Sequence, residues 1–181
     1  MTDDLDIQVW VGRTADLYDD WHTLMCEWTV EETGEKLDSE AWATEMLGQV
    51  QSPGFAVIVA YDGDMAVGFV EAMAWRASAP GVFMGRGDHA YVSPEYRDQG
   101  VYEAIFDAGY NYLTSIGVEK IQLPVSKGHG ASWLRPFYEG RGFRETEIIM
   151  EKDLRPARPL PDRSQVLERW ATSVHDEMRA A

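Results

Sequence analysis

The sequence predicts an α/β fold in which a mixed, mostly antiparallel central sheet is flanked by helices. Two turn signals, Asp62-Gly63 and Ala79-Pro80-Gly81, join apolar runs of strand length, as in consecutive β-hairpins. Beyond residue 100 the pattern changes to alternating helical and strand-like segments, which is typical of crossover connections. With 181 residues, 45% of them hydrophobic, the chain is long enough for one domain with a substantial core.

The first half of the chain predicts a strand, two helices and three antiparallel strands. Alternating apolar residues indicate the first strand, and Thr14 is the expected N-cap of a helix whose apolar positions recur at helical spacing up to Trp28. Ser39 is the expected cap of a second helix, which ends before the breaker Ser52-Pro53-Gly54. The expected ranges are a strand at 5–11, helices after residue 14 and at 39–50, and strands at 55–61, 65–75 and 82–92.

The second half predicts two helix–strand units. Residues 101–116 have helical periodicity and end at Gly117, and a short apolar strand at 121–125 is suited to burial in the sheet. A helix at 132–139 and a strand at 143–154 complete the order β α α β β β α β α β.

The C-terminal segment, residues 155–181, is expected to lie outside the domain formed by residues 1–154. Three prolines in the seven residues 155–161 predict an extended, Pro-rich connector. The amphipathic helix expected at 162–180 either packs on its own domain or contacts a second subunit or another partner. Its apolar stripe consists of Val166, Leu167, Trp170, Val174 and Met178.

The formal net charge of −15 and a sequence pI near 4.5 restrict the partners. Binding nucleic acid through its phosphates requires a basic surface, so we expect no nucleic-acid partner, and cationic partners fit better. Residues 1–50 hold thirteen acids and two bases, so the N-terminal third carries most of the negative charge. This acidic third is either a solvated surface or the side that meets a cationic ligand.

The single cysteine, Cys26, rules out an intramolecular disulfide and indicates a reducing compartment. The N-terminus lacks a basic region followed by an apolar run, and no 18 consecutive residues are apolar, so we expect neither a signal peptide nor a membrane span. We expect no metal site, because His22 has no partner at metal-ligand spacing and a cysteine cluster is impossible. These features predict a soluble cytoplasmic protein.

The segment that carries chemistry runs from residue 90 to residue 102. A strand ends at Val92, Pro94 and Gly100 turn the chain, and a helix begins near Val101. Free amide groups and the positive end of the helix then point into one place, which predicts an anion site. The loop has neither the lysine nor the hydroxyl of a nucleotide-triphosphate loop, so a diphosphate held mainly by backbone amides fits better.

This segment resembles the signature V-x-P-x-x-R-x-x-G-x-G/A of the GNAT superfamily of N-acetyltransferases. The matching residues are Val92, Pro94, Arg97 and Gly100. A second segment, Phe137-Tyr138-Glu139-Gly140-Arg141-Gly142-Phe143, is similar to the L/F-Y-x-x-x-G-F of that family. The resemblance covers roughly residues 5–154. It implies a GNAT-like sheet with splayed fourth and fifth strands, acetyl-CoA as co-substrate, and direct attack of a primary amine on its thioester.

By resemblance, the acetyl-CoA site follows the end of the fourth strand and the loop after it, and an amide N–H near Tyr91 or Val92 is the oxyanion donor. Two residues depart from the family pattern, because Tyr102 replaces its glycine or alanine and Ala131 replaces its frequent asparagine. These departures favour an alternative, a non-catalytic GNAT-fold binding or assembly protein with weakened CoA binding. The expected cofactor-binding residues are Tyr91, Val92, Arg97, Asp98, Gln99, Gly100, Val101 and Tyr102.

The resemblance also implies catalytic roles. Tyr138 occupies the position of the proton donor to the departing thiolate. The family's strand carboxylate corresponds to Arg86, which cannot accept a proton at neutral pH. Asp88 lies two residues on, on the same face of the strand, and is expected to act as the base through a water; a chain of water molecules alone is the alternative. His89 is expected on the opposite face, in a structural role, unless a bulge reverses the register.

In this family the first two helices and the loop between them usually shape the acceptor side. Here that loop is expected at residues 29–36, where three glutamates would attract a polyamine, an aminoglycoside or a lysine-rich protein. The alternative is an exposed, solvated turn. Lys127 and Arg135 follow the fifth strand and are candidates for contacts with the CoA phosphates.

Overall fold

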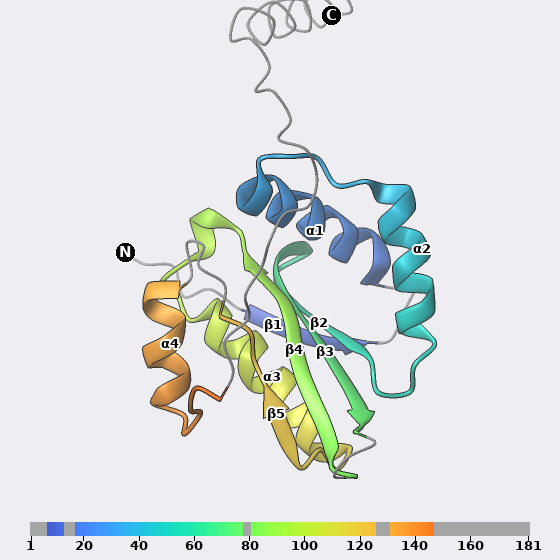
Figure 1. Cartoon of the computed structure of the whole chain (residues 1–181). Coiled ribbons are helices and arrows are strands. Elements are labelled where there is room, and N and C mark those ends of the chain that lie inside the picture. The colour runs from blue at the N-terminus through green and yellow to red at the C-terminus, as the bar shows by residue number, and fades with distance from the viewer. Residues whose placement is uncertain (1–6, 13–16, 78–80, 126–130, 147–181) are drawn as a thin grey trace, which may run out of the picture. The chain divides into compact units, whose positions relative to one another are not determined.

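The computed structural model describes residues 7–12, 17–77, 81–125 and 131–146 (Figure 1). The chain divides into two units, residues 1–143 and 144–181, and every element named below belongs to the first. The strands are β1 (Ile7–Gly12), β2 (Ala56–Asp62), β3 (Met65–Arg76), β4 (Phe83–Val92) and β5 (Lys120–Gln122). The helices are α1 (Tyr18–Thr33), α2 (Ser39–Val50), the 3-10 turn η2 (Pro94–Tyr96), α3 (Val101–Ser115) and α4 (Ala131–Glu139).

The five strands form one sheet in the order β1-β2-β3-β4-β5. Strands β1 to β4 are antiparallel neighbours, whereas β5 lies parallel to β4 because α3 carries the chain back between them. β5 pairs only with Met84, Gly85 and Arg86, so residues 87–92 of β4 have no strand partner on that side in the described chain. This divergence is the predicted splay of the fourth and fifth strands.

Helices cover both faces of the sheet, as Figure 1 shows. α1 and α2 pack on one face in a cluster that includes Trp21, Trp42 and Phe69. α3 packs on the other face, where Ile58 and Ile105 are fully buried. The sheet is therefore the middle of three layers, and a residue on β3 or β4 faces either α1 and α2 or α3.

The predicted elements are confirmed for most of the described chain, with shifted ends. α2 is capped by Asp38 rather than Ser39, because the Asp38 carboxylate accepts the amide of Ala41 at 3.0 Å. The expected strand at 143–154 is absent from residues 143–146, which carry no regular structure, and its remainder lies outside the described residues. Thr14, the turn at Ala79-Pro80, the connector and the C-terminal helix also lie outside them.

None of the described helices has the length and apolar character needed to cross a bilayer.

The expected loop at residues 29–36 is wrong over its first half, because α1 continues to Thr33. The hydroxyls of Thr29 and Thr33 each donate to the carbonyl four residues earlier, at 2.7 Å, which gives these polar β-branched residues partners within the helix. Gly34, at φ +71°, ends the helix by donating its amide to Val30 at 2.9 Å. Two of the three glutamates predicted in a loop therefore lie on the last turns of a rigid helix.

A bulge in β4 determines which of its side chains face α1 and α2. Val70 pairs with Ala90 and Ala72 pairs with Gly87, so Glu71 alone stands opposite two residues of β4, Asp88 and His89. The extra residue interrupts the alternation of the strand, and His89 reaches Glu71 on the face covered by α1. This bulge is the exception that the sequence leaves open, and it places His89 on the same face as Asp88 rather than on the opposite one.

Candidate active site

The loop between β4 and α3 forms a cradle of backbone groups. η2 turns the chain, and then Asp98 at φ +58° and Gly100 at φ +82° adopt the left-handed conformation just before α3 begins at Val101. A Cβ at Gly100 would meet no atom within 4 Å, so the space in front of the helix is open. The first-turn amides of α3 have no partner within the helix and carry its positive dipole end. The predicted anion site is thus a geometrically suitable place for a diphosphate.

Arg97 connects this loop to the end of β4 and to α1. Its Nε donates to the carbonyl of Val92 at 2.9 Å, and its Nη2 pairs with Glu31 at 2.6 Å. The guanidinium also lies 5.6 Å from the ring centre of Tyr91. The bond to Glu31 raises the pKa of Arg97 further above its ordinary value. Arg97 therefore fixes the loop against α1 while remaining about one third exposed.

Tyr102 and Tyr138 lie side by side, with 2.6 Å between their hydroxyl oxygens. The ring of Tyr102 contacts Trp133 edge-on at 4.7 Å and Phe137 at 5.4 Å, so the phenol is directed toward α4. Burial raises the pKa of both phenols, but the bond from Tyr102 lowers that of Tyr138. Both phenols keep their protons at neutral pH. The hydrogen bond between them makes Tyr138 the better proton donor of the two, because it lowers the pKa of Tyr138 and raises that of Tyr102.

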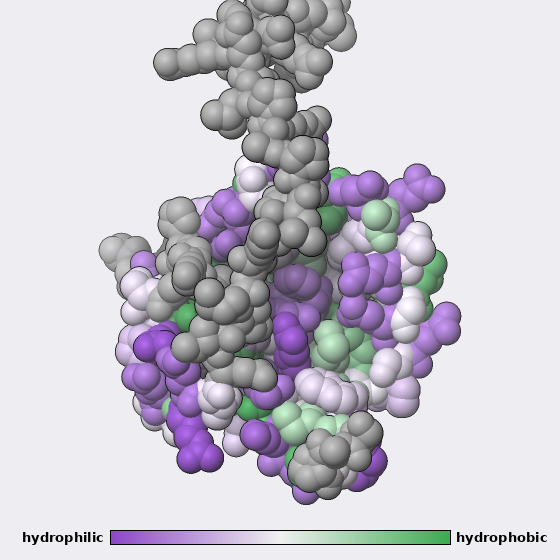
Figure 2. All heavy atoms as spheres, viewed as in Figure 1, coloured by the Kyte–Doolittle hydropathy of each residue, from purple (hydrophilic) through white to green (hydrophobic). Residues whose placement is uncertain are grey.

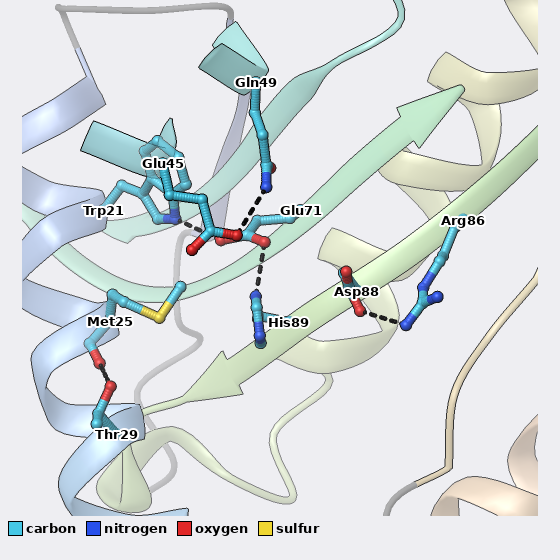
Figure 3. A network of polar contacts seen from close by, with 9 residues as sticks. All are labelled: Trp21, Met25, Thr29, Glu45, Gln49, Glu71, Arg86, Asp88 and His89. Carbon is cyan, nitrogen blue, oxygen red and sulfur yellow. Dashed lines mark hydrogen bonds and ion pairs between the residues drawn. The ribbon is translucent and has the colours of Figure 1, made fainter. Parts of the chain in front are cut away.

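A buried carboxylate lies under α1 on the opposite side of β4 from the α3 layer (Figure 3). Glu71 is 1% exposed; its Oε1 accepts the indole N–H of Trp21 at 3.1 Å and its Oε2 pairs with Nδ1 of His89 at 2.8 Å. The His89 ring lies 4.6 Å from that of Trp28, edge to face. Burial acts to lower the pKa of His89, but the bond and charge of Glu71, with the charges of Asp88 and Glu45, raise it above its ordinary value.

Asp88 and Arg86 occupy the same face of β4, as the sequence predicts, and form an ion pair of 2.9 Å (Figure 3). One carboxylate oxygen of Asp88 is thereby engaged by a guanidinium. The Nε of Arg86 is buried and has no hydrogen-bond partner among the described residues. The predicted base is thus present at the site but is already paired with a cation.

Acidic side chains of α1 converge on the end of β4. Glu27 accepts the hydroxyl of Ser93 at 3.1 Å, and Glu31 pairs with Arg97. Burial, followed by the charges of Glu27 and Glu31, raises the pKa of Tyr91 to about 12. In Figure 2 the flank where α2 lies carries hydrophilic side chains interspersed with hydrophobic ones. The α1 side of β4 therefore has a negative potential that suits a cationic ligand.

The fold and this loop are those of the class of GNAT-fold proteins. The sequence profile of the acetyltransferase (GNAT) domain matches residues 53–145, which is half of the chain, and the chain belongs to that family. A comparison with curated protein sequences found no match.

Solved structures share the fold at low sequence identity. The aminoglycoside acetyltransferase AAC(6')-Iy, in complex with a bisubstrate analogue, has a TM-score of 0.65 at 19% identity, covering 83% of this chain and 99% of that one. An aminoglycoside acetyltransferase from an uncultured soil metagenomic sample, in complex with sisomicin, has a TM-score of 0.64 at 13% identity, covering 82% of this chain and 97% of that one. A ribosomal-protein-alanine N-acetyltransferase from Brucella melitensis biovar Abortus 2308 has a TM-score of 0.61 at 16% identity, covering 82% of this chain and 98% of that one.

The structure places several of the predicted residues in contact, namely Val92 with Arg97 and Tyr102 with Tyr138, and Glu71 and His89 lie on the α1 side of the same strands. Sequence reasoning missed Glu71, and it expected His89 on the opposite face unless a bulge intervened, which is the case here. A signal for Glu71 exists, since it is a charged residue in the middle of an apolar strand, between Val70 and Ala72. Lys127 lies outside the described residues, as does the side chain of Ala131. Within the described ranges, no group of three or more histidine, cysteine or acidic side chains could hold a metal ion.

Proposed function

We propose that the protein is an N-acetyltransferase that transfers the acetyl group of acetyl-CoA to a primary amine by direct attack. The observation that carries this proposal is the 2.6 Å contact between Tyr102, in the first turn of α3, and Tyr138, in α4. It brings the family's proton-donor position to the anion-binding loop, although the two motifs are separated by a helix and a strand in the sequence.

The residues after β4 suit the co-substrate, which supplies a thioester-activated acetyl group. The amides of residues 98–102 and the dipole of α3 would hold its diphosphate, with Gly100 keeping the approach open. Tyr91 and Val92 lie on the part of β4 that β5 leaves unpaired, so an amide there is our candidate oxyanion donor. Arg97 would act mainly by fixing the loop, because its guanidinium is already bonded to Glu31.

Tyr138 is the proposed general acid. The residue is 8% exposed, its phenol retains its proton at neutral pH, and its hydroxyl oxygen lies 2.6 Å from that of Tyr102. Its proton passes to the leaving sulfur as the C–S bond breaks. For the base, Asp88 acting through a water is the candidate that follows from the sequence, although its bond to Arg86 weakens that candidate.

The proposed acceptor is a polycationic amine: an aminoglycoside, a polyamine or a lysine-rich protein. Its support is the acidic side of β4, where Glu27 bonds to Ser93 and Glu31 to Arg97 at the end of the strand, and Glu71 bonds to His89 within it. Two of the similar structures are aminoglycoside acetyltransferases and one is a ribosomal-protein acetyltransferase. A cytoplasmic location and a partner contact through the C-terminal helix remain predictions.

The alternative is a GNAT-fold binding or assembly protein with weakened CoA binding. Tyr102 favours it, because a phenol replaces the small residue that lets the helix start approach the diphosphate. The direction of the ring weakens it, since Tyr102 packs against Trp133 and Phe137 of α4. The two functions differ in whether acetyl-CoA binds.

A thermal-shift titration with acetyl-CoA tests the proposal. A ligand that binds only the folded state stabilises it by about 2.7 kcal/mol at one hundred times its Kd. Gly100→Ala should abolish most of the shift, and Gly117→Ala is the matched control, because both glycines have positive φ and open surroundings at opposite ends of α3. Absence of a shift in the native protein at millimolar acetyl-CoA would exclude the enzyme and favour the alternative.

A further inference from the structure

Glu71 is an unusual residue to find in the middle of this sheet. Its neighbours on the same face of β3, Phe69 and Met73, belong to the apolar cluster under α1 and α2, and its own side chain is 1% exposed. A buried carboxylate is costly unless its charge is compensated by hydrogen bonds or a cation. Its partners therefore indicate what the position is for.

The hydrogen bonds of Glu71 determine the tautomer of His89. An ionised carboxylate can only accept hydrogen bonds. The Nδ1–H of His89 therefore donates a hydrogen bond to Oε2 of Glu71, at 2.8 Å, while the indole N–H of Trp21 donates one to Oε1, at 3.1 Å. When the ring is neutral, its lone pair is then on Nε2. The edge-on contact with Trp28 limits rotation of the ring. His89 is thus a histidine oriented by a buried acid, with its basic nitrogen directed away from that acid.

The position of His89 suits a role at the acceptor amine. It lies on β4 two residues before Tyr91, within the stretch that β5 leaves unpaired, and its side chain is 36% exposed. Among the described residues, none bonds to its Nε2. Asp88 is next to it in the bulge but is paired with Arg86. His89 is therefore the more available basic group on the acidic side of β4.

We infer that His89 is the general base that deprotonates the acceptor ammonium, and that Glu71 is its positioning residue; this rests on the proposed function. Nε2 of His89 takes one proton from the ammonium, and the freed lone pair forms the new C–N bond. Tyr138 gives its proton to the sulfur as the C–S bond breaks and regains one from the nitrogen as the amide forms. His89 then releases its proton to solvent, so that the reaction liberates one proton in total.

The charges around His89 predict the pH dependence. Glu71 on β3, Asp88 on its own strand and Glu45 on α2 are the acids that act on it, whereas α1 contributes the uncharged Trp21 and Trp28. Together the acids raise the pKa of His89 above 6.5. A base works when deprotonated, so activity should rise with pH through this raised pKa. Glu71→Gln removes the largest of these charges and should move the rise to lower pH.

An NMR titration of the full-length protein tests the geometry without any turnover. His89 should titrate above 6.5 in the native protein and at a lower pH in Glu71→Gln, and its ring resonances should shift when sisomicin, used as the amine probe, is added. His22→Gln serves to assign the signals and as the control, because His22 bonds to Ser39 at 2.9 Å, between α1 and α2. The inference would be overturned if the pKa of His89 were the same in Glu71→Gln as in the native protein, or if its ring resonances did not shift at saturating sisomicin.

Kinetics separate a base from a structural histidine. With acetyl-CoA and the best acceptor among sisomicin, spermine and polylysine, His89→Gln should lower kcat about 100-fold or more while the acetyl-CoA thermal shift persists. Glu71→Gln should move the rising limb of the pH–rate profile by the amount measured in the NMR titration, and His22→Gln should leave it in place. Loss of activity in Asp88→Asn with His89→Gln unaffected would return the role to Asp88. Failure of the thermal shift instead removes the proposed function itself.

Discussion

The two sides of β4 are built in different ways. On the loop side, the anion cradle consists of consecutive backbone groups in residues 98–102, positioned by one left-handed glycine and a helix start. On the α1 side, the site is assembled from side chains far apart in the sequence: Trp21 with Glu71, and Glu27 with Ser93. The first kind of site is determined by a local motif, whereas the second depends on which strands and helices become neighbours. Variants that affect one side and not the other test this distinction.

The largest expected effect comes from Tyr138→Phe. Removing the hydroxyl removes the proposed proton donor to the leaving sulfur, and kcat should fall about 100-fold or more. The ring remains, so its contacts with Phe106 and Phe143 are kept and the acetyl-CoA thermal shift should persist. Tyr110→Phe, at an exposed tyrosine on α3, is the control. An unchanged rate in Tyr138→Phe would remove Tyr138 from the mechanism.

A pair of tryptophan variants tests the side-chain-built site through stability. Trp21→Phe leaves the buried Glu71 without one of its donors, whereas Trp42→Phe removes a buried indole N–H that has no partner among the described residues. Both changes shrink a ring in the same cluster. In urea denaturation Trp21→Phe should therefore cost about 1–3 kcal/mol more than Trp42→Phe. Equal losses would mean that the Trp21 bond does not stabilise the folded state.

The fold and the course of the loop after β4 are well predicted from the sequence, and the reason is locality. Turn residues, helical periodicity and the spacing from Val92 to Gly100 are all readable within a few residues. The bulge opposite Glu71 is not, because it depends on the register of two strands, so the sequence alone leaves the face of His89 open. The helical continuation of α1 was missed for a related reason: the hydroxyls of Thr29 and Thr33 find partners within the helix, and Glu31 on its last turns pairs with Arg97, which is 66 residues away in the sequence.

Tyr102 tests whether the departure from the family pattern impairs the loop. Tyr102→Phe removes the bond that lowers the pKa of Tyr138, so Tyr138 becomes a weaker acid and kcat should fall about 5–10-fold, as expected for the loss of about 1 kcal/mol. Affinity for acetyl-CoA, measured by calorimetry, should hardly change, because the ring already packs toward α4. A large gain in affinity in Tyr102→Ala would instead show that the phenol obstructs the diphosphate and would favour the binding-protein alternative.

The smallest expected effect concerns Glu31, the residue that joins the two sides of the site. Its pair with Arg97 is about one third exposed, so Glu31→Gln should cost less than about 1 kcal/mol of stability. The same change removes a negative charge near the loop, so the positive charge of Arg97 is no longer compensated. Acetyl-CoA should therefore bind about 2–5-fold more tightly at low salt, and sisomicin should bind more weakly. Glu32→Gln, one residue along the helix, is the matched control for net charge. If both variants shift both affinities equally, the effect comes from overall charge, and the two sides of β4 are not coupled through Arg97.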